Sequence, residues 1–216
     1  MLDVLFKGGP TMVPLMVCSI LSLAVFIERF LYFRKLDNNN FRLFKKLELL
    51  IANSNLSKAK KMVKAARGPV AAMVEQGLEG YGEDKATVRE YVKLGGENEI
   101  RKMEKRLRIL DFIATIAPLL GLLGTVIGII NSFNILAGAQ GMAGPGALSV
   151  GIAQALISTA AGLIVAIPTT LFYTYLDSQV EDKTNELNQW SAKLVNLLAE
   201  DGSTSRVRGD RYVSKR

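Results

Sequence analysis

Hydrophobic residues are concentrated in two blocks, and the longer block organises the chain. The stretch from Phe112 to Leu176 contains no Asp, Glu, Lys or Arg. A helix crosses the hydrocarbon core with about 20 apolar residues, so this stretch predicts two spans joined by a turn. The glycines and the proline of Ala137–Gly146 break helices and mark that turn. We predict spans over 111–136 and 148–176, with a short turn over 137–147.

The remaining apolar block lies near the N-terminus. Thr11–Ile27 contains no charged residue, and the apolar run resumes in Phe30–Phe33. We predict a span over 10–33, preceded by a short segment over 1–9. A cleaved signal peptide is the alternative, but it fits poorly because the first residues are not basic and no small-residue cleavage site follows.

A polar, helical segment over 34–110 separates the first two spans. Gly68-Pro69 predicts a helix start, because proline is favoured in the first turn. A later helix is expected to run into the second span, with a possible kink at Gly95-Gly96. Apolar residues also recur at helical spacing after Asn40; they are Phe41, Phe44, Leu47, Leu50 and Ile51.

The third span is predicted to continue as an amphipathic helix over 177–201. Its apolar side is expected to hold Val180, Leu187, Trp190, Leu194 and Leu197. Residues 202–216 contain Ser, Gly and Arg with little to bury, which predicts a disordered basic tail.

The charge pattern predicts the orientation. The formal net charge is +7, and residues 34–108 hold 18 of the 27 basic side chains against 10 acidic ones. The positive-inside rule places this segment and the C-terminus in the cytoplasm, and the N-terminus and the turn outside. The fold class is therefore an all-α polytopic membrane protein with three transmembrane helices and long helices that extend into the cytoplasm.

Small residues line one face of each core span. Ala117, Gly121, Thr125, Gly128 and Ser132 recur at intervals of three or four, and so do Gly151, Ala155, Thr159, Gly162 and Ala166. Such faces allow close helix packing in lipid. Packing alone is one interpretation, and a threonine that bonds to its own helix is another. A pore lined by hydroxyl groups is the functional interpretation.

No carboxylate lies in the middle of any predicted span. Gln154 is the most polar residue deep in the membrane, and it cannot titrate. A proton path normally needs a titratable relay, so a carboxylate would have to come from another chain.

The core spans resemble the ExbB/TolQ/MotA proton-channel family, ExbB/TolQ branch. The resemblance is carried by the run from Thr115 to Gly128, the run from Gly151 to Pro168, and Glu28-Arg29 near the end of the first span. It implies a homopentamer in the bacterial inner membrane with a periplasmic N-terminus. Two copies of an ExbD- or TolR-like single-span subunit are expected in the pore, each with one aspartate. Ion flow would then drive a TonB- or TolA-like protein.

Several residues match family positions. Thr125 and Thr159 match the two pore threonines, and Pro118 and Pro168 match the helix prolines. Gly121, Gly124, Gly128 and Gly162 are expected to be structural. Glu28 and Arg29 are expected to be a charge pair near the cytoplasmic interface, bonded to each other or to a neighbouring helix. Some members have Glu where this chain has Gln154, so Gln154 is open to two interpretations, a place in the ion path or a packing bond.

Two rival classes follow from the same residues. A non-conducting scaffold would use the basic cytoplasmic helices to recruit partners or membrane lipids. An enzyme is disfavoured because the chain has no histidine and its one cysteine, Cys18, has no base. We expect no catalytic residues, metal or cofactor, and no nucleic-acid partner.

Overall fold

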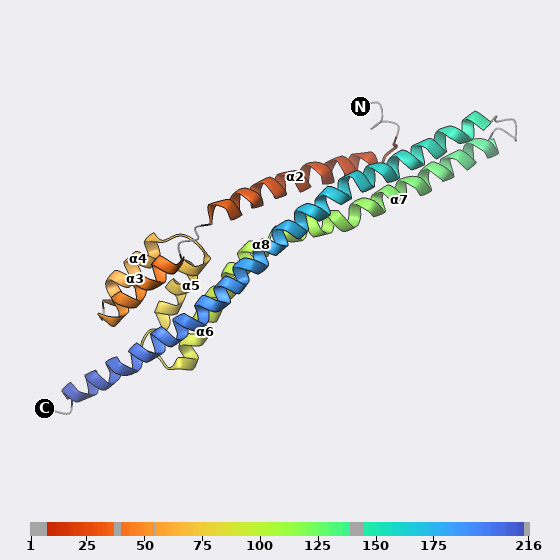
Figure 1. The fold of residues 1–216 in the computed structure, drawn as a ribbon. Helices are drawn as coiled ribbons and strands as arrows, with labels where there is room; N and C mark the ends of the chain where they lie inside the picture. Colours follow the sequence, from red (N-terminus) through yellow and green to blue (C-terminus); the bar gives the residue numbers. More distant parts are fainter. Residues whose placement is uncertain (1–7, 37–39, 54, 139–144, 214–216) are drawn as a thin grey trace. The chain divides into compact units, whose positions relative to one another are not determined.

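The computed structural model describes residues 8–36, 40–53, 55–138 and 145–213. These residues are helical with no strand among them, and three helices are long and apolar enough to cross a membrane. The predicted all-α class with three candidate spans is confirmed. The helices are α2 (Met12–Lys35), α3 (Asn40–Ala52), α4 (Leu56–Ala65), α5 (Pro69–Gly77), α6 (Lys85–Glu104), α7 (Leu107–Gly138) and α8 (Pro145–Val213), with a 3₁₀ helix, η1 (Leu78–Gly80), after α5 (Figure 1).

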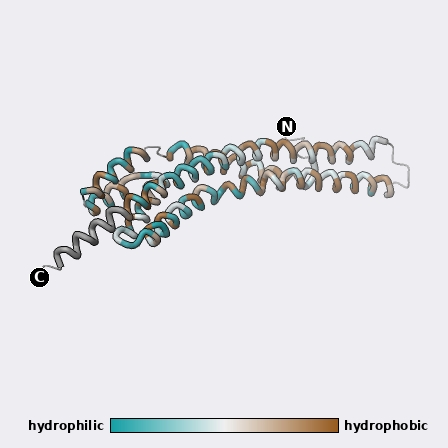
Figure 2. Tube along the Cα trace, turned by 60° about the horizontal axis from the view of Figure 1, so that its bottom comes forward, coloured by the Kyte–Doolittle hydropathy of each residue, from teal (hydrophilic) through white to brown (hydrophobic). Residues whose placement is uncertain are grey.

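The chain divides into two compact units. The first contains α2 up to Leu31 and the chain from Arg106 to Asp177, which includes α7 and the first part of α8. Hydrophobic residues dominate these helices (Figure 2). Large apolar side chains remain exposed along all three of them, for example Ile20, Leu122 and Ile164. Such exposure is unfavourable in water but is expected of helices that face lipid or other membrane helices.

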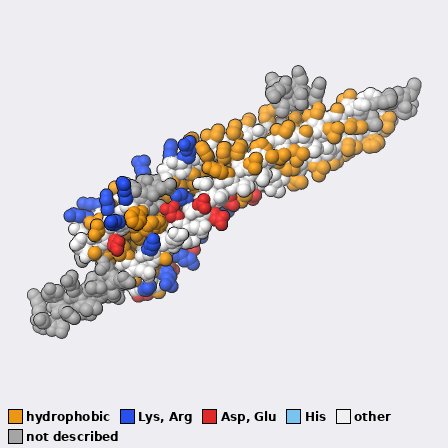
Figure 3. Space-filling model, in the orientation of Figure 1, with side chains coloured by type: hydrophobic (Ala, Val, Ile, Leu, Met, Phe, Trp, Pro, Cys, Tyr) orange, Lys and Arg blue, Asp and Glu red, His pale blue; other side chains and the backbone are white. Residues whose placement is uncertain are grey.

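The second unit contains Tyr32–Lys105 and α8 from Ser178 onward. Its core includes Met73 and Val74 of α5, Val88 and Val92 of α6, and Leu194 of α8, all fully buried. Lysine and arginine side chains gather over the surface of this unit (Figure 3). Burial of Val180, Leu187 and Leu194 confirms the predicted apolar side of the amphipathic helix.

Local signals explain the helix boundaries of the second unit. Gly68, with φ +117°, precedes α5, and Pro69 occupies its first turn, so the predicted start is confirmed. Asp84 caps α6 by accepting hydrogen bonds from the backbone N–H groups of Ala86 and Thr87.

Two features differ from the sequence prediction. The helix continues through Gly95 and Gly96, and the interruption lies at Lys105-Arg106. Position 95 has no room for a side chain larger than that of glycine. A Cβ there would lie 2.9 Å from Cβ of Gln76 and 3.1 Å from Cα of Met73, both on α5. In addition, α8 includes residues 202–213, where the sequence predicts a disordered tail. That stretch contains no proline that would stop a helix.

Candidate functional site

The helices α7 and α8 approach each other closely along their glycines. A Cβ on Gly121 would lie 3.2 Å from Cα of Gly162, and one on Gly162 would lie 2.7 Å from the carbonyl oxygen of Ala117. A Cβ on Gly128 would lie 2.9 Å from the carbonyl oxygen of Gly151. The obstructing atoms are backbone, which cannot rotate away. The glycines therefore set the antiparallel register in which residue 117 faces 162 and residue 128 faces 151.

The two predicted pore threonines lie in different surroundings. The Thr125 hydroxyl donates to the carbonyl oxygen of Leu122 in its own helix, at 2.5 Å. The Thr159 hydroxyl donates across the helix pair to the carbonyl oxygen of Gly121, at 3.3 Å. Both side chains are half-buried in the single chain. Each hydroxyl oxygen keeps the capacity to accept a hydrogen bond from water or from another chain.

A buried hydroxyl pair connects α8 with the start of α2. Thr11 Oγ1 and Ser158 Oγ lie 2.7 Å apart, and both residues are buried. Gly124 makes room for this pair, because a Cβ there would lie 2.7 Å from Thr11 Oγ1 and closer still to Ser158 Oγ. Sequence analysis did not single out Thr11. Its position directly after Gly8-Gly9-Pro10, before an apolar helix, was the available signal.

Gln154 packs against the turn that precedes α2. A Cβ on Gly9 would lie 2.2 Å from the amide nitrogen of Gln154. Gly9 has φ +79°, which other residues adopt only with strain. The Gln154 side chain therefore occupies space that is open only because residue 9 is glycine.

Each core helix continues through one interior proline. Pro118 lies in α7, and Pro168 lies in α8. Proline has no backbone N–H and so leaves the carbonyl four residues earlier without its helical donor. Just after Pro168, the hydroxyl groups of Thr169 and Thr170 donate to the carbonyl oxygens of Val165 and Ala166.

The two charged residues of the first span, Glu28 and Arg29, lie in different surroundings. Glu28 forms an ion pair with Arg106, which directly precedes α7. Its neighbour Arg29 is buried, at 7% exposed. Aromatic contacts support the same end of α2, since Phe26 stacks on Phe172 of α8 with ring centroids 4.0 Å apart. A bond from Glu28 to a charged group beside a neighbouring helix is one of the two arrangements expected for it.

The polar groups where α7, α8 and the start of α2 meet offer hydrogen bonds. Among the described residues there is no group of histidine, cysteine or acidic side chains that could hold a metal ion. Hydroxyl, carbonyl and amide groups converge where α7, α8 and the start of α2 meet. They can hydrate or position an ion carrier, and they bring no charge of their own.

Comparison with known proteins identifies relatives over most of the chain. Residues 65–189 match the model of the MotA/TolQ/ExbB proton channel family. The biopolymer transport protein ExbB of Aquifex aeolicus is 41% identical over 116 residues, covering 54% of this chain and 75% of that protein. A putative ExbB-like protein of Synechocystis is 34% identical over 181 residues, covering 82% and 71%. The Tol-Pal system protein TolQ of Haemophilus influenzae is 41% identical over 96 residues, covering 44% and 41%.

Proposed function

Because the chain belongs to the MotA/TolQ/ExbB proton channel family, we propose that it is the channel-forming subunit of a motor driven by an ion gradient. Five copies surround a pore, and proton or sodium flow through it is converted into mechanical work. The family is one of membrane channel proteins, and the three apolar helices make this chain a multi-pass membrane protein.

The observation that carries the proposal is that the core helices contain uncharged polar side chains but no charged ones. Residues 112–176 contain Thr125, Thr159 and Gln154 but no titratable carboxylate. A path for protons needs such a group, so the partner must supply it. An ExbD- or TolR-like subunit with one intramembrane aspartate, present in two copies, meets that need.

The threonines act as hydrogen-bond partners for that aspartate. A protonated carboxyl donates one hydrogen bond, and the hydroxyl oxygens of Thr125 and Thr159 are free to accept because each donates its proton to a carbonyl. One charge crossing 100 mV releases about 2.3 kcal/mol. This exceeds the roughly 0.5–1.5 kcal/mol of a hydrogen bond at a helix interface, so ion flow can drive small steps between subunits.

The same proposal assigns a location to each segment. The protein lies in the bacterial inner membrane, with residues 1–9 and 137–147 in the periplasm and residues 34–110 and 177–216 in the cytoplasm. The work is delivered to a TonB- or TolA-like protein of the envelope.

The proposal is tested by ion flux in vesicles that contain the full chain and its single-span partner. Thr125→Val and Thr159→Val keep the side-chain shape and remove the hydroxyl. We expect the double variant to assemble normally and to lose about tenfold or more of the flux, which corresponds to about 1.4 kcal/mol. Thr170→Val is the matched control, because its hydroxyl also bonds to its own helix but is assigned no place in the pore.

Unchanged flux in the double variant would remove both threonines from the mechanism. A wild-type complex that assembles with its partner but conducts no ions would favour the scaffold function instead.

A further inference from the structure

The second unit contains an aromatic groove that the proposed ion path does not use. It is a cavity of about 380 Å³ between α3 and the part of α8 that follows Ser178. Its apolar lining comes from Phe41, Phe44, Trp190 and Leu197, and its charged lining from Lys45, Glu48 and Lys193. We call this set of residues the α3–α8 groove.

The floor of the groove is fixed by contacts within the unit, whereas its rim is exposed. The rings of Phe44 and Trp190 stack with centroids 4.3 Å apart, and the Lys193 ammonium lies 4.5 Å from the centroid of the Trp190 ring. Phe41 forms the rim. It shares the apolar spacing of α3 with Phe44 and Leu47, which are buried, yet Phe41 is 69% exposed. The groove is therefore a preformed apolar surface that is open to a further apolar group.

Exposed apolar side chains are few in this unit, and this narrows the choice of occupant. Among the residues of the unit whose exposure is described, three large apolar side chains are exposed, namely Phe41, Leu49 and Leu94. Leu49 lies on α3 outside the lining of the groove, whereas Leu94 lies on α6 and is 48% exposed. Burial of two such groups against each other is favourable. Because Phe41 and Leu94 both remain exposed within one chain, they can be buried together only between two copies.

The charge beside Leu94 complements the charge of the groove. Glu90 precedes Leu94 by four residues, so the two side chains share one side of α6. Glu90 is exposed and forms no ion pair with any residue that the structure describes. Glu97, one turn later, is paired within α6, so Glu90 is the carboxylate available to another copy. In the groove, Lys45 is likewise exposed and has no ion-pair partner among the described residues.

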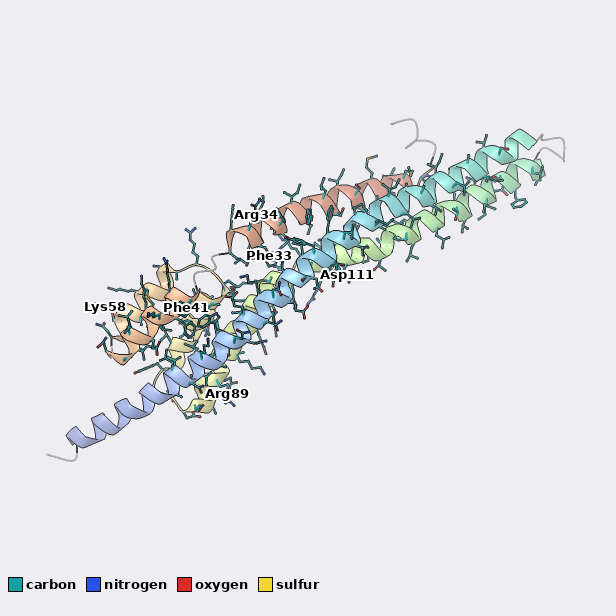
Figure 4. All side chains as sticks on the ribbon, viewed as in Figure 1. Phe33, Arg34, Phe41, Lys58, Arg89 and Asp111 are labelled. Atoms are coloured by element: carbon teal, nitrogen blue, oxygen red, sulfur yellow. The ribbon has the colours of Figure 1, made fainter. Side chains whose placement is uncertain are left out.

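The groove and the start of α6 are separate surfaces of the unit. Figure 4 shows Phe41 and Arg89, the residue before Glu90, on opposite sides of the last part of α8. The groove of one copy and α6 of the next can therefore meet without competing for the same surface. A contact between two different patches repeats from copy to copy, and it closes into a ring when the rotation between copies fits.

From these observations we propose that the α3–α8 groove of one copy binds α6 of a neighbouring copy. Leu94 enters the mouth of the groove beside Phe41 and is buried there. The Glu90 carboxylate then pairs with Lys45, and this pairing sets the orientation of the contact. The proposal rests on the homo-oligomer of the proposed function, and it adds a link between copies outside the membrane-spanning helices.

Disulfide formation between two differently tagged forms of the full chain tests the contact. One form carries Phe41→Cys and the other Leu94→Cys, and both carry Cys18→Ser so that no other thiol is present. The two forms are co-expressed, purified in a neutral detergent and oxidised, and the cross-linked dimers are measured on denaturing gels. We expect at least about fivefold more cross-linking in the mixture than in either form alone, because the contact joins two different patches.

Leu49 supplies the matched control for the groove. It is exposed on the same helix as Phe41 but lies outside the lining. The Leu49→Cys form is therefore expected to cross-link to the Leu94→Cys form no more than either form does alone. A single chain that carries both Phe41→Cys and Leu94→Cys is expected to give a ladder of cross-linked copies, because every copy then has both halves of the contact.

Charge reversal tests the pairing of Glu90 with Lys45. Glu90→Lys on the Leu94→Cys form is expected to lower the cross-linked fraction about threefold or more, because it places two lysines together. Lys45→Glu on the Phe41→Cys form is expected to restore most of that fraction. Lys46→Glu, one residue further and outside the lining, is expected not to restore it. Circular dichroism shows whether each variant is folded.

Native mass spectrometry of the same samples separates this proposal from the oligomer on which it rests. A pentamer in which the Phe41→Cys and Leu94→Cys forms do not cross-link would overturn the contact and leave the proposed function standing. Monomers alone would overturn both. Equal cross-linking by Leu49→Cys, or of Phe41→Cys to itself, would also contradict the contact. A disulfide between Phe41→Cys and a different protein would assign the groove to that partner instead.

Discussion

The hydroxyl groups of Thr11 and Ser158 lie 2.7 Å apart in a buried contact between residues separated by 147 positions in the sequence. This contact attaches the start of the first span to the middle of the third. A buried hydroxyl without its partner is costly, whereas two apolar replacements leave no unsatisfied group.

The hydroxyl pair can be tested by a double-mutant cycle. Thr11→Val and Ser158→Ala are each expected to destabilise the protein by roughly 0.5–2 kcal/mol, and the double variant by less than the sum. Unfolding in mixed micelles would measure the free energies. Strictly additive effects would show that the two hydroxyls contribute independently.

The glycine contacts predict which helix positions cannot accommodate even one methyl group. Gly162→Ala is expected to destabilise the α7–α8 pair by about 1–3 kcal/mol, because its Cβ would meet the Ala117 backbone. Gly138→Ala is the control, because a Cβ there has nothing within 4 Å. Thermal unfolding of both variants in detergent would compare them. Equal stability of the two variants would mean that α7 and α8 move apart to accommodate the methyl group without a loss of free energy of unfolding.

Much of this architecture could be predicted from the sequence because lipid imposes a simple pattern. An uncharged stretch long enough for two spans, and glycines at intervals of three or four, require only the local sequence. Gly68-Pro69 likewise marks a helix start by itself. The family motifs likewise predict Thr125 and Thr159 as pore residues, and that assignment stays a prediction.

Other features depend on contacts between distant residues and could not be predicted. The pairing of Thr11 with Ser158 requires the register of α2 against α8. Gly95-Gly96 suggests a kink when considered alone, but in the fold Gly95 provides room for α5. The exposure of Phe41 is also invisible to periodicity, because its spacing is that of a buried residue.

The ion pair of Glu28 predicts a charge-reversal rescue. Glu28→Arg and Arg106→Glu each place like charges together, so each is expected to reduce the yield of assembled oligomer. The double reversal restores attraction and is expected to recover much of that yield. Native mass spectrometry would count the copies, and five are expected in the wild type. Failure of the double variant to recover would show that each residue has a further essential contact.

The cap of α6 predicts a local pH dependence. The Asp84 carboxylate accepts hydrogen bonds from the Thr87 hydroxyl, at 2.5 Å, and from the backbone N–H groups of Thr87 and Ala86, at 3.3 and 3.0 Å. The Thr87 side-chain hydrogen bond, followed by these backbone bonds, lowers the pKa of Asp84 below its ordinary value. A lowered pKa means that the cap stabilises the helix above the unfolded pKa and weakens as pH falls through the folded one.

Hydrogen exchange at the amides of Ala86 and Thr87 would measure this dependence. In the wild type, protection relative to the intrinsic exchange rate is expected to fall in acid, below the ordinary aspartate range. Asp84→Asn keeps a capping oxygen without a charge, so its protection is expected to stay level. The same acid loss in both proteins would contradict the role of the carboxylate.

Gln154 offers a choice between packing and ion transfer that one substitution series can decide. Its amide group packs against Gly9, whose backbone has positive φ, so the structure favours a packing role. Gln154→Leu is expected to lower the unfolding free energy by about 1 kcal/mol and to leave the ion flux per assembled complex unchanged. Gln154→Glu retains the shape of the side chain and is expected to be tolerated. Flux measured per complex, with the partner subunit present, separates the two roles. A strong loss of flux in Gln154→Leu with normal stability would place this residue in the ion path.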